Sequence, residues 1–200
     1  MTRIFLVRHG ETKGNSTERF WGQTDVELSY YGTSQVEQLR DRLAQENIDA
    51  VYSSDLCRAL KTAEIIVSRH KLAVTACHEL REIDFGSVEG LAFREINQRH
   101  PELRSWLSHD LNFRFPDGES VFELNDRVIR FLCRLEEHAQ GETILVVAHS
   151  GVLRLLICNV LGIELRHWRQ IRLDLASLSI LQTYPEVAIL SLLNDVSHLH

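Results

Sequence analysis

The apolar residues of this chain fall into short continuous runs that alternate with stretches of helical spacing. The runs Ile4–Val7 and Thr143–Ala148 are too short for helices and have no polar alternation, so we predict strands buried on both faces. Asp49–Tyr52 is a third predicted strand, and two later strands are predicted at 178–181 and 187–192.

Between these runs, apolar residues recur at the three- and four-residue spacing of helices. The pattern predicts helices around Val36–Leu43 and Leu56–Val67, and a helix of about eighteen residues behind the capping box Ser120–Glu123. A largely buried helix from Val152 is predicted to close at Gly162. Strands that alternate with helices predict a three-layer α/β/α fold, with helices on both faces of a mostly parallel sheet.

One stretch, Glu82 to Gly118, departs from this alternation. It mixes glycines, prolines and scattered aromatic residues, with a weak helical pattern only around Phe93 to Arg99. Long irregular segments in compact domains are commonly lids or binding loops, so we expect an insertion over the sheet edge at about 82–118. No repeat or composition shift marks a second domain, and residues 1–200 are predicted to form one domain.

Composition and charge narrow the class of protein. Hydrophobic residues make up 44% and charged residues 25%, which is typical of globular domains and excludes a disordered or collagen-like chain. The net charge of −6 disfavours nucleic acid and acidic membranes as partners. No apolar run reaches the length of a membrane span or of a signal peptide core, which favours a cytoplasmic location.

The four cysteines show no C-x-x-C pair, so free thiols are expected rather than a zinc site or a disulfide framework. Cys57 directly precedes Arg58. A neighbouring cation can favour a thiolate, which leaves oxidative inhibition at Cys57 open.

Two histidines, His9 and His149, each follow a predicted buried strand. Because ligands of parallel sheets bind outside the carboxyl ends of the strands, both imidazoles are expected to face one crevice, although a single histidine there is more often an ordinary turn residue. Arg8 ends a buried strand, where an unpaired guanidinium is costly. Arg58 lies in the first turn of its predicted helix, where the helix dipole disfavours a cation, and the alternative is that it is a solvated surface arginine. A bound anion would explain both positions, and the helix that opens at Gly151 would point its N–H groups to the same place.

Several ordered sequence blocks resemble the histidine phosphatase, or phosphoglycerate mutase-like, superfamily. The blocks are Leu6–Thr12 with Asn15, Arg19–Gly32, Tyr52–Ala63, Leu80–Gly90, Gly118–Ser120 and Val146–Gly151. A lone Arg-His-Gly would carry little weight, whereas this ordered set covers nearly the whole chain. The resemblance implies one histidine phosphatase domain with the phosphoglycerate mutase-like fold.

The resemblance also implies a phosphohistidine mechanism without a metal ion or other cofactor, as in a metal-independent histidine phosphatase of the acid type. It assigns catalytic roles to His9 as nucleophile, Glu82 as general acid and then base, and Arg8, Arg58 and His149 as phosphate ligands. Taken alone, Glu82 is also consistent with a surface carboxylate paired with Arg81.

Further positions match the family's substrate pocket. They are Asn15, Trp21, Gly22, Gln23, Ser150 and Gly151. The asparagine and glycine of the first loop are almost as well explained by turn formation. Trp21 could stack on a substrate ring or fill the core.

The expected partner is a small phosphate monoester, and the expected activity is its hydrolysis. The Arg19–Gly32 block and the stretch Leu193–Leu199 loosely resemble α-ribazole phosphatases of cobalamin biosynthesis, which makes α-ribazole 5′-phosphate a candidate substrate. Val88 and Glu27 replace the Trp and Pro common in relatives, so the resemblance does not define the leaving-group pocket. Alternatives are a phosphoglycerate mutase and a broad-specificity sugar phosphatase; a non-catalytic binding protein is disfavoured because all five reactive positions are present. The sequence does not determine the oligomeric state, and a homodimer is one alternative.

Overall fold

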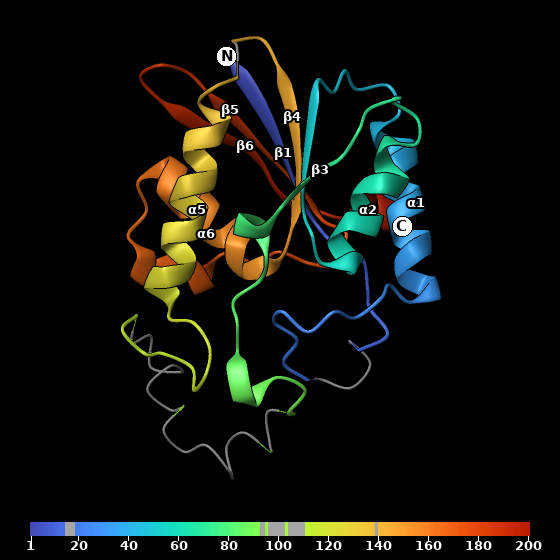
Figure 1. Cartoon of the computed structure of the whole chain (residues 1–200). Coiled ribbons are helices and arrows are strands. Elements are labelled where there is room, and N and C mark those ends of the chain that lie inside the picture. Colours follow the sequence, from blue (N-terminus) through green and yellow to red (C-terminus); the bar gives the residue numbers. More distant parts are fainter. Residues whose placement is uncertain (15–18, 93–94, 96–102, 104–110, 139) are drawn as a thin grey trace.

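The computed structural model describes residues 1–14, 19–92, 95, 103, 111–138 and 140–200. Its centre is a six-stranded sheet with the order β3-β2-β4-β1-β5-β6 (Figure 1). The strands are β1 (Thr2–Arg8), β2 (Ala50–Ser54), β3 (Thr75–Cys77), β4 (Thr143–Ala148), β5 (Leu178–Thr183) and β6 (Ala188–Asp195). The first four are parallel, and β5 pairs antiparallel with both β1 and β6. The predicted α/β fold with a mostly parallel sheet is confirmed.

Helices cover both faces of the sheet, as predicted. In Figure 1, α1 (Tyr30–Leu43) and α2 (Cys57–Val67) lie on one face, and α5 (Val121–Leu135) and α6 (Ser150–Leu161) lie on the other. Successive side chains of a strand point to opposite faces, so an unbroken apolar run can serve two cores. In β1, Leu6 packs into the core beneath α5 and α6, while Phe5 and Val7 pack into the core beneath α1 and α2.

The ends of the helices follow local capping chemistry. The predicted capping box is present, because Ser120 accepts from the Glu123 N–H and the Glu123 carboxylate accepts from the Ser120 N–H. Gly162 ends α6 with a φ of 66°, the left-handed conformation that glycine adopts without strain. Helix α5 has 15 residues rather than about eighteen, since its buried stripe ends at Leu135.

The structure also adds an element that the apolar pattern does not predict. Strand β3 is only three residues long, and its first two residues are exposed, so it carries neither an apolar run nor an alternation. The described part of the predicted 82–118 segment extends beyond the carboxyl ends of the parallel strands (Figure 1). Most of the weak helical pattern at 93–99 lies outside the described residues. The insertion and its action as a lid stay predictions.

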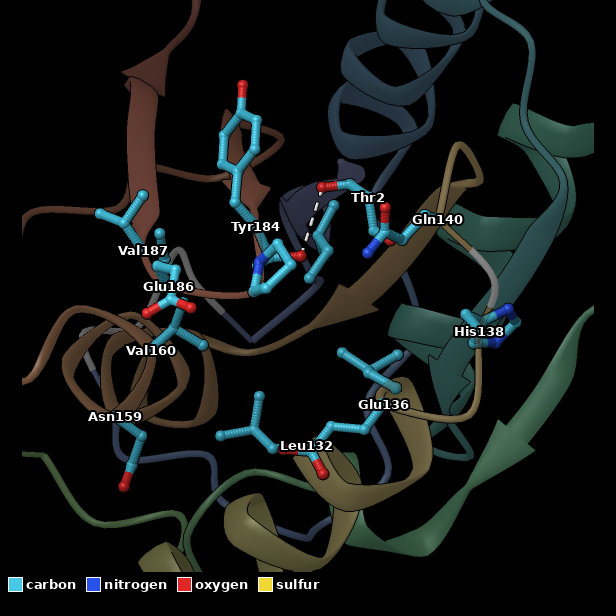
Figure 2. A pocket seen from close by; sticks show the side chains of 15 residues that line it. Thr2, Leu132, Glu136, His138, Gln140, Asn159, Val160, Tyr184, Glu186 and Val187 are labelled. Carbon is cyan, nitrogen blue, oxygen red and sulfur yellow. Dashed lines mark hydrogen bonds between the residues drawn. The ribbon is translucent and has the colours of Figure 1, made fainter.

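Cavities open at both ends of the sheet. One of about 630 Å³ lies at the amino-terminal end of β1, bounded by α5, α6 and the turn between β5 and β6 (Figure 2). The other cavities considered below lie at the opposite end, where β1 and β4 finish. Within the described residues, no helix combines the length and apolar character that crossing a membrane requires.

Candidate active site

Two histidines meet where the central parallel strands end. Strands β1 and β4 pair with Arg8 opposite Ala148, so the next residues, His9 and His149, leave the sheet side by side. Their ring centroids are 5.0 Å apart and their planes are inclined at 60°. Both are buried, with 6% and 1% of their surface exposed. The register of a parallel strand pair thus places two imidazoles in one crevice.

The ring of His9 has a defined orientation. Its Nδ1 lies 2.7 Å from the backbone oxygen of Gly10. A carbonyl oxygen only accepts, so Nδ1 carries the proton and Nε2 keeps its lone pair. Burial lowers the pKa of His9 well below its ordinary value, and the positive charges of Arg58 and Arg8 lower it further. His9 is therefore a neutral imidazole with a free Nε2 lone pair near neutral pH.

His149 is held from the opposite side. Its Nε2 lies 2.9 Å from the hydroxyl of Ser54, at the end of β2. Its Nδ1 is buried and has no hydrogen-bond partner among the described residues. Burial lowers the pKa of His149 well below its ordinary value, and the charge of Arg58 adds to the effect. An unpartnered buried ring nitrogen is costly, so this atom is suited to a ligand.

Two arginines supply positive charge beside the histidines. Arg8 donates from Nη1 to the oxygen of Leu173 at 2.7 Å, while its Nε is buried without a partner. Burial lowers the pKa of Arg8 to about 10. Arg58 is only 2% exposed and donates to the backbone oxygens of Gly22 and Thr24. The interpretation of Arg58 as a solvated surface arginine is wrong, because the guanidinium is buried against the loop between β1 and α1.

Among the described residues, neither arginine forms an ion pair with a carboxylate. Burial also lowers the pKa of the Arg58 guanidinium. Removing two cations from water without an ion pair is unfavourable, and the nearby charge of Glu82 opposes only part of this effect. A bound dianion between Arg8 and Arg58 would offset that cost.

Glu82 lines the same cavity as His9, with 8% of its surface exposed. Its carboxylate accepts from the backbone N–H of Ile83 at 3.0 Å and of Gly151 at 3.1 Å, and Ser150 Oγ is 3.4 Å away. The first N–H groups of α6 were expected to face a substrate anion, whereas the structure directs that of Gly151 to Glu82. A Cβ on Gly151 would lie 2.3 Å from Glu82 Oε1, so this approach requires glycine.

These side chains line one cavity of about 210 Å³. Its wall consists of Arg8, His9, Thr12, Arg19, Phe20, Trp21, Arg58, Glu82, Phe85, His149 and Ser150. All five residues that carry the predicted chemistry therefore face a common space, together with two of the predicted substrate-binding residues.

Comparison with known proteins now places the chain in a family. The family model described as the histidine phosphatase superfamily (branch 1) matches residues 4–196. The chain belongs to this superfamily. It is 32% identical to phosphoserine phosphatase 1 of Hydrogenobacter thermophilus, over 100% of this chain and 95% of that one. It is 40% identical to phosphoglycerate mutase-like protein 4 of Arabidopsis thaliana, over 76% of this chain and 68% of that one. The crystal structure of the α-ribazole phosphatase of Shigella flexneri superposes with a TM-score of 0.90 at 33% identity, covering 97% and 96% of the two chains.

Two other predicted ligands contact residues of the cavity wall rather than the cavity itself. Gly22 and Gln23 are not part of the cavity wall. Gly22 presents its backbone oxygen to Arg58, and Gln23 donates from Nε2 to the backbone oxygen of Glu82 at 3.3 Å. A Cβ on Gly22 would lie 2.3 Å from the oxygen of Ile83. Asn15 lies outside the described residues.

Trp21 forms part of the wall of the cavity. A Cβ on Gly14 would lie 2.3 Å from Trp21 Nε1, so the indole packs closely against the backbone of the first loop. Gly90 approaches the other end of the ring, at 3.6 Å from the position of a Cβ. Its Nε1 is buried without a hydrogen-bond partner among the described residues. The ring is thus wedged between two loops and also available to a ligand.

Arg127 is a supporting residue that the motifs did not indicate. It is 5% exposed and pairs with the carboxylate of Glu119. It also donates to the backbone oxygens of Glu79, Arg81 and Glu82. The sequence signal that could have indicated this residue is a cationic side chain on the apolar stripe of α5. Arg127 fixes the backbone that presents Glu82.

Two other expectations are corrected here. Arg81 does not pair with Glu82; its Nε and Nη2 donate to the two carboxylate oxygens of Asp55, each at 2.7 Å. Burial and the neighbouring Asp25 raise the pKa of Cys57 to about 11, which outweighs the opposite effect of Arg58. Cys57 is therefore held as a thiol, and a thiolate at this position is wrong.

The described residues contain no group of three or more His, Cys, Asp and Glu side chains arranged to hold a metal ion. None of the four cysteines forms a disulfide. The charges that face the cavity come instead from Arg8, Arg19 and Arg58.

Proposed function

We propose that the protein hydrolyses phosphate monoesters of small metabolites through a phosphohistidine at His9. One observation carries the proposal: a neutral imidazole, two arginines without carboxylate partners among the described residues, and a carboxylate line the same small cavity. Membership of the histidine phosphatase superfamily supports the same chemistry.

In the first step, His9 Nε2 attacks phosphorus in line with the leaving oxygen. A P–N bond forms as the P–O bond to the leaving group breaks, and Glu82 in its acid form gives its proton to the leaving oxygen. Arg8 and Arg58 hold the equatorial phosphoryl oxygens, where charge is greatest in the transition state.

His149 adds a hydrogen bond to the same group. Ser54 Oγ accepts from the Leu56 N–H, so its own proton is available to His149 Nε2. In that tautomer Nδ1 carries the ring proton and donates it to a phosphoryl oxygen. The hydrogen bond would satisfy the Nδ1 atom of His149, which is buried and has no partner within the described residues.

In the second step, water attacks the phosphohistidine. Glu82, now a carboxylate, takes a proton from the water as the P–N bond breaks, and inorganic phosphate leaves with His9 restored. The second step returns the proton that the first step consumed. Placement of Glu82 by two backbone N–H groups and a glycine makes it a proton carrier with little freedom to move.

We propose further that no metal ion takes part. The arginines and His149 supply the positive charge and hydrogen bonds that a metal supplies in other phosphatases. Activity is expected to survive incubation with EDTA. Loss of activity that zinc or magnesium restores would contradict this part of the proposal.

The similar proteins suggest two candidate activities that differ in substrate and in the acceptor of the phosphoryl group. The similarity to the Shigella flexneri α-ribazole phosphatase makes α-ribazole 5′-phosphate one substrate to test. The similarity to a phosphoglycerate mutase-like protein favours a second candidate activity, in which another hydroxyl takes the phosphoryl group from His9 before water does. Comparing phosphate release with isomerisation of 3-phosphoglycerate separates the two.

The direct test is to trap the intermediate. Enzyme mixed with p-nitrophenyl phosphate and quenched in alkali, where phosphohistidine survives, should carry one phosphate on His9 by mass spectrometry. Phosphate on Cys57 or another residue would contradict the mechanism. Failure of any phosphate ester to label or turn over would favour a binding protein that keeps the fold without catalysis.

A further inference from the structure

A second cavity shares Glu82 with the cavity around His9. Its volume is about 380 Å³, and its wall consists of Glu82, Ile83, Phe85, Ser150, Gly151, Arg154, Trp168 and Arg169. Three of these residues, Glu82, Phe85 and Ser150, also line the catalytic cavity. The two spaces are therefore neighbours that share Glu82 as part of their common wall.

This second cavity contains two arginines on one aromatic ring. Arg154 lies one helical turn after Ser150 in α6, and Arg169 belongs to the 3₁₀ helix η5 (Leu165–Gln170). Their guanidinium carbons lie 6.0 and 5.3 Å from the centre of the Trp168 ring. Trp168 itself is 4% exposed. A buried indole thus holds two cations beside each other by cation–π contact.

Glu82 attracts Arg154 across the cavity but forms no ion pair with it. The Nε of Arg154 is buried without a hydrogen-bond partner, and Arg154 forms no ion pair in the part of the chain that the structure describes. Burial lowers the pKa of Arg154 and lowers that of Arg169 to about 10, and the proximity of Arg154 contributes to the second shift. Like charges in a half-buried space repel each other, and an anion between them would relieve both costs.

The position of Glu82 decides which part of a substrate would enter. In the proposed mechanism the phosphoryl group lies among Arg8, His9 and Arg58, and Glu82 meets the leaving oxygen. Glu82 also lines the cavity of Arg154 and Arg169, so atoms of the leaving group beyond that oxygen would lie next to this cavity. A cavity of this size accommodates a small leaving group.

We infer that Arg154, Arg169 and Trp168 form a subsite for a second anionic group, a carboxylate or a further phosphate, carried by the leaving group of the substrate. The inference rests on the proposed function and gives its substrate class. It favours acidic phosphate monoesters over those that release a neutral alcohol or nucleoside.

The test compares esters that differ only in the second anion. The carboxylate arm uses 3-phosphoglycerate against glycerol 3-phosphate, and the phosphate arm uses fructose 1,6-bisphosphate against fructose 6-phosphate. In one arm, wild-type kcat/KM for phosphate release should be at least about tenfold higher for the acidic ester, because hydrogen bonds between charged groups contribute this much or more. The arm that shows the preference identifies the anion.

Variants then locate the effect. Arg154→Gln and Arg169→Gln should each reduce that preference about tenfold, mainly by raising KM for the acidic ester, and Arg154→Lys should recover part of it. The matched control is Arg166→Gln, which removes a charge from the same η5 helix at an exposed side chain paired with Glu164. Its preference should equal that of the wild type. Thermal unfolding of each variant checks that it folds.

The outcomes separate this inference from the proposed function. The subsite is overturned if neither arm shows a preference, or if Arg154→Gln lowers kcat/KM equally for both members of a pair. It is also overturned if α-ribazole 5′-phosphate exceeds every acidic ester. In each of these cases His9 would still carry phosphate and p-nitrophenyl phosphate would still be hydrolysed. Absence of phosphohistidine and of turnover on all esters would instead contradict the phosphatase proposal itself.

Discussion

The two ends of the sheet carry cavities that differ in charge as well as in size. The cavity at the amino-terminal end of β1 is about 630 Å³, three times the volume of the one around His9, yet no arginine or lysine lines it. Its polar side chains are mostly satisfied: His138, labelled in Figure 2, contacts the Tyr52 hydroxyl at 2.9 Å and the Glu142 carboxylate at 2.5 Å. Volume alone would select the wrong end of this molecule for phosphate chemistry.

Four of the six buried side-chain atoms without partners among the described residues belong to the smaller cavity and its neighbour; the other two are His70 Nε2 and Ser177 Oγ. Within the described residues, buried side-chain nitrogens without partners include Arg8 Nε, Trp21 Nε1, His149 Nδ1 and Arg154 Nε, and all four residues line these two cavities. Folding leaves such groups unpaired only at a cost, which a ligand can offset. Buried cations and unpaired donors therefore distinguish a ligand site from a gap between elements.

The largest effect should come from removing the nucleophile. His9→Ala should lower turnover by at least about 10⁴-fold on every ester, because it deletes the atom that bonds to phosphorus. The matched variant is His138→Ala, which deletes an imidazole from the wall of the larger cavity. It should keep kcat/KM within about twofold while losing about 1 kcal/mol of stability with its two hydrogen bonds. Steady-state kinetics and urea unfolding measure both; strong loss of turnover in His138→Ala would mean that the two ends are coupled.

Glu82→Gln should have the next largest effect, and the effect should depend on the leaving group. General acid catalysis contributes about 10²–10⁴ in rate, so hydrolysis of alkyl phosphates should fall by that order. Nitrophenolate leaves without a proton, so p-nitrophenyl phosphate should still phosphorylate His9 and give a burst, followed by slow hydrolysis. The corresponding variant at the other end is Glu136→Gln, for which neither ester should change.

Rapid-quench kinetics distinguishes the proton carrier from a structural carboxylate. If Glu82→Gln slows phosphorylation of His9 equally with alkyl and nitrophenyl esters, then Glu82 only maintains the pocket. The general acid would then have to be another residue of the cavity wall.

Whether the sequence predicts a feature of the fold or the site depends on the kind of interaction that forms the feature. The fold and the meeting of His9 with His149 are predictable, because buried apolar runs define the strands and the ends of parallel strands lie at one edge. The roles of Gly22 and Gln23 are not, since a motif does not show whether a polar group faces a ligand or another loop. Arg127 depends on contacts between residues far apart in the chain.

Strand β3 and Arg154 show the same limit. β3 is too short to display a periodic pattern, and it forms because β2 offers an unpaired edge. Arg154 interrupts an apolar helix, but only the packing of η5 against α6 reveals a second arginine and an indole beside it. Local pattern predicts elements and their ends, whereas sites that join distant elements require coordinates.

Gly151→Ala should have a moderate effect. The added methyl group would lie 2.3 Å from Glu82 Oε1 and would displace the carboxylate, lowering turnover of alkyl phosphates by about 10–10². Gly162→Ala tests the opposite end of the same helix: its φ of 66° strains alanine by about 1 kcal/mol, with no contact to the site. The first variant should lose activity and the second only stability. Equal kinetics for the two variants would contradict the requirement for close approach at Gly151.

The last expected effect is on stability at mildly acidic pH and needs no change in turnover. The pKa values of His9 and His149 are held well below 6.5 by burial first and by neighbouring arginines second. In the unfolded chain these rings take up protons as the pH falls through about 6.5, while the folded protein does not. The unfolded state then binds more protons, so the free energy of unfolding decreases as the pH falls below that value. Each ring contributes up to about 1.4 kcal/mol per pH unit until its folded pKa is reached. His198 adds a smaller contribution to this pH dependence, since burial lowers its pKa too.

Urea unfolding between about pH 7 and pH 5 measures the slope of the unfolding free energy against pH, above the range in which most carboxylates titrate. The double variant His9→Gln/His149→Gln should show a shallower slope than the wild type, whereas His138→Gln, at the other end of the sheet, tests whether the acid sensitivity belongs to the catalytic end. Equal slopes in the wild type and the double variant would show that the two catalytic rings do not stay neutral in the folded protein.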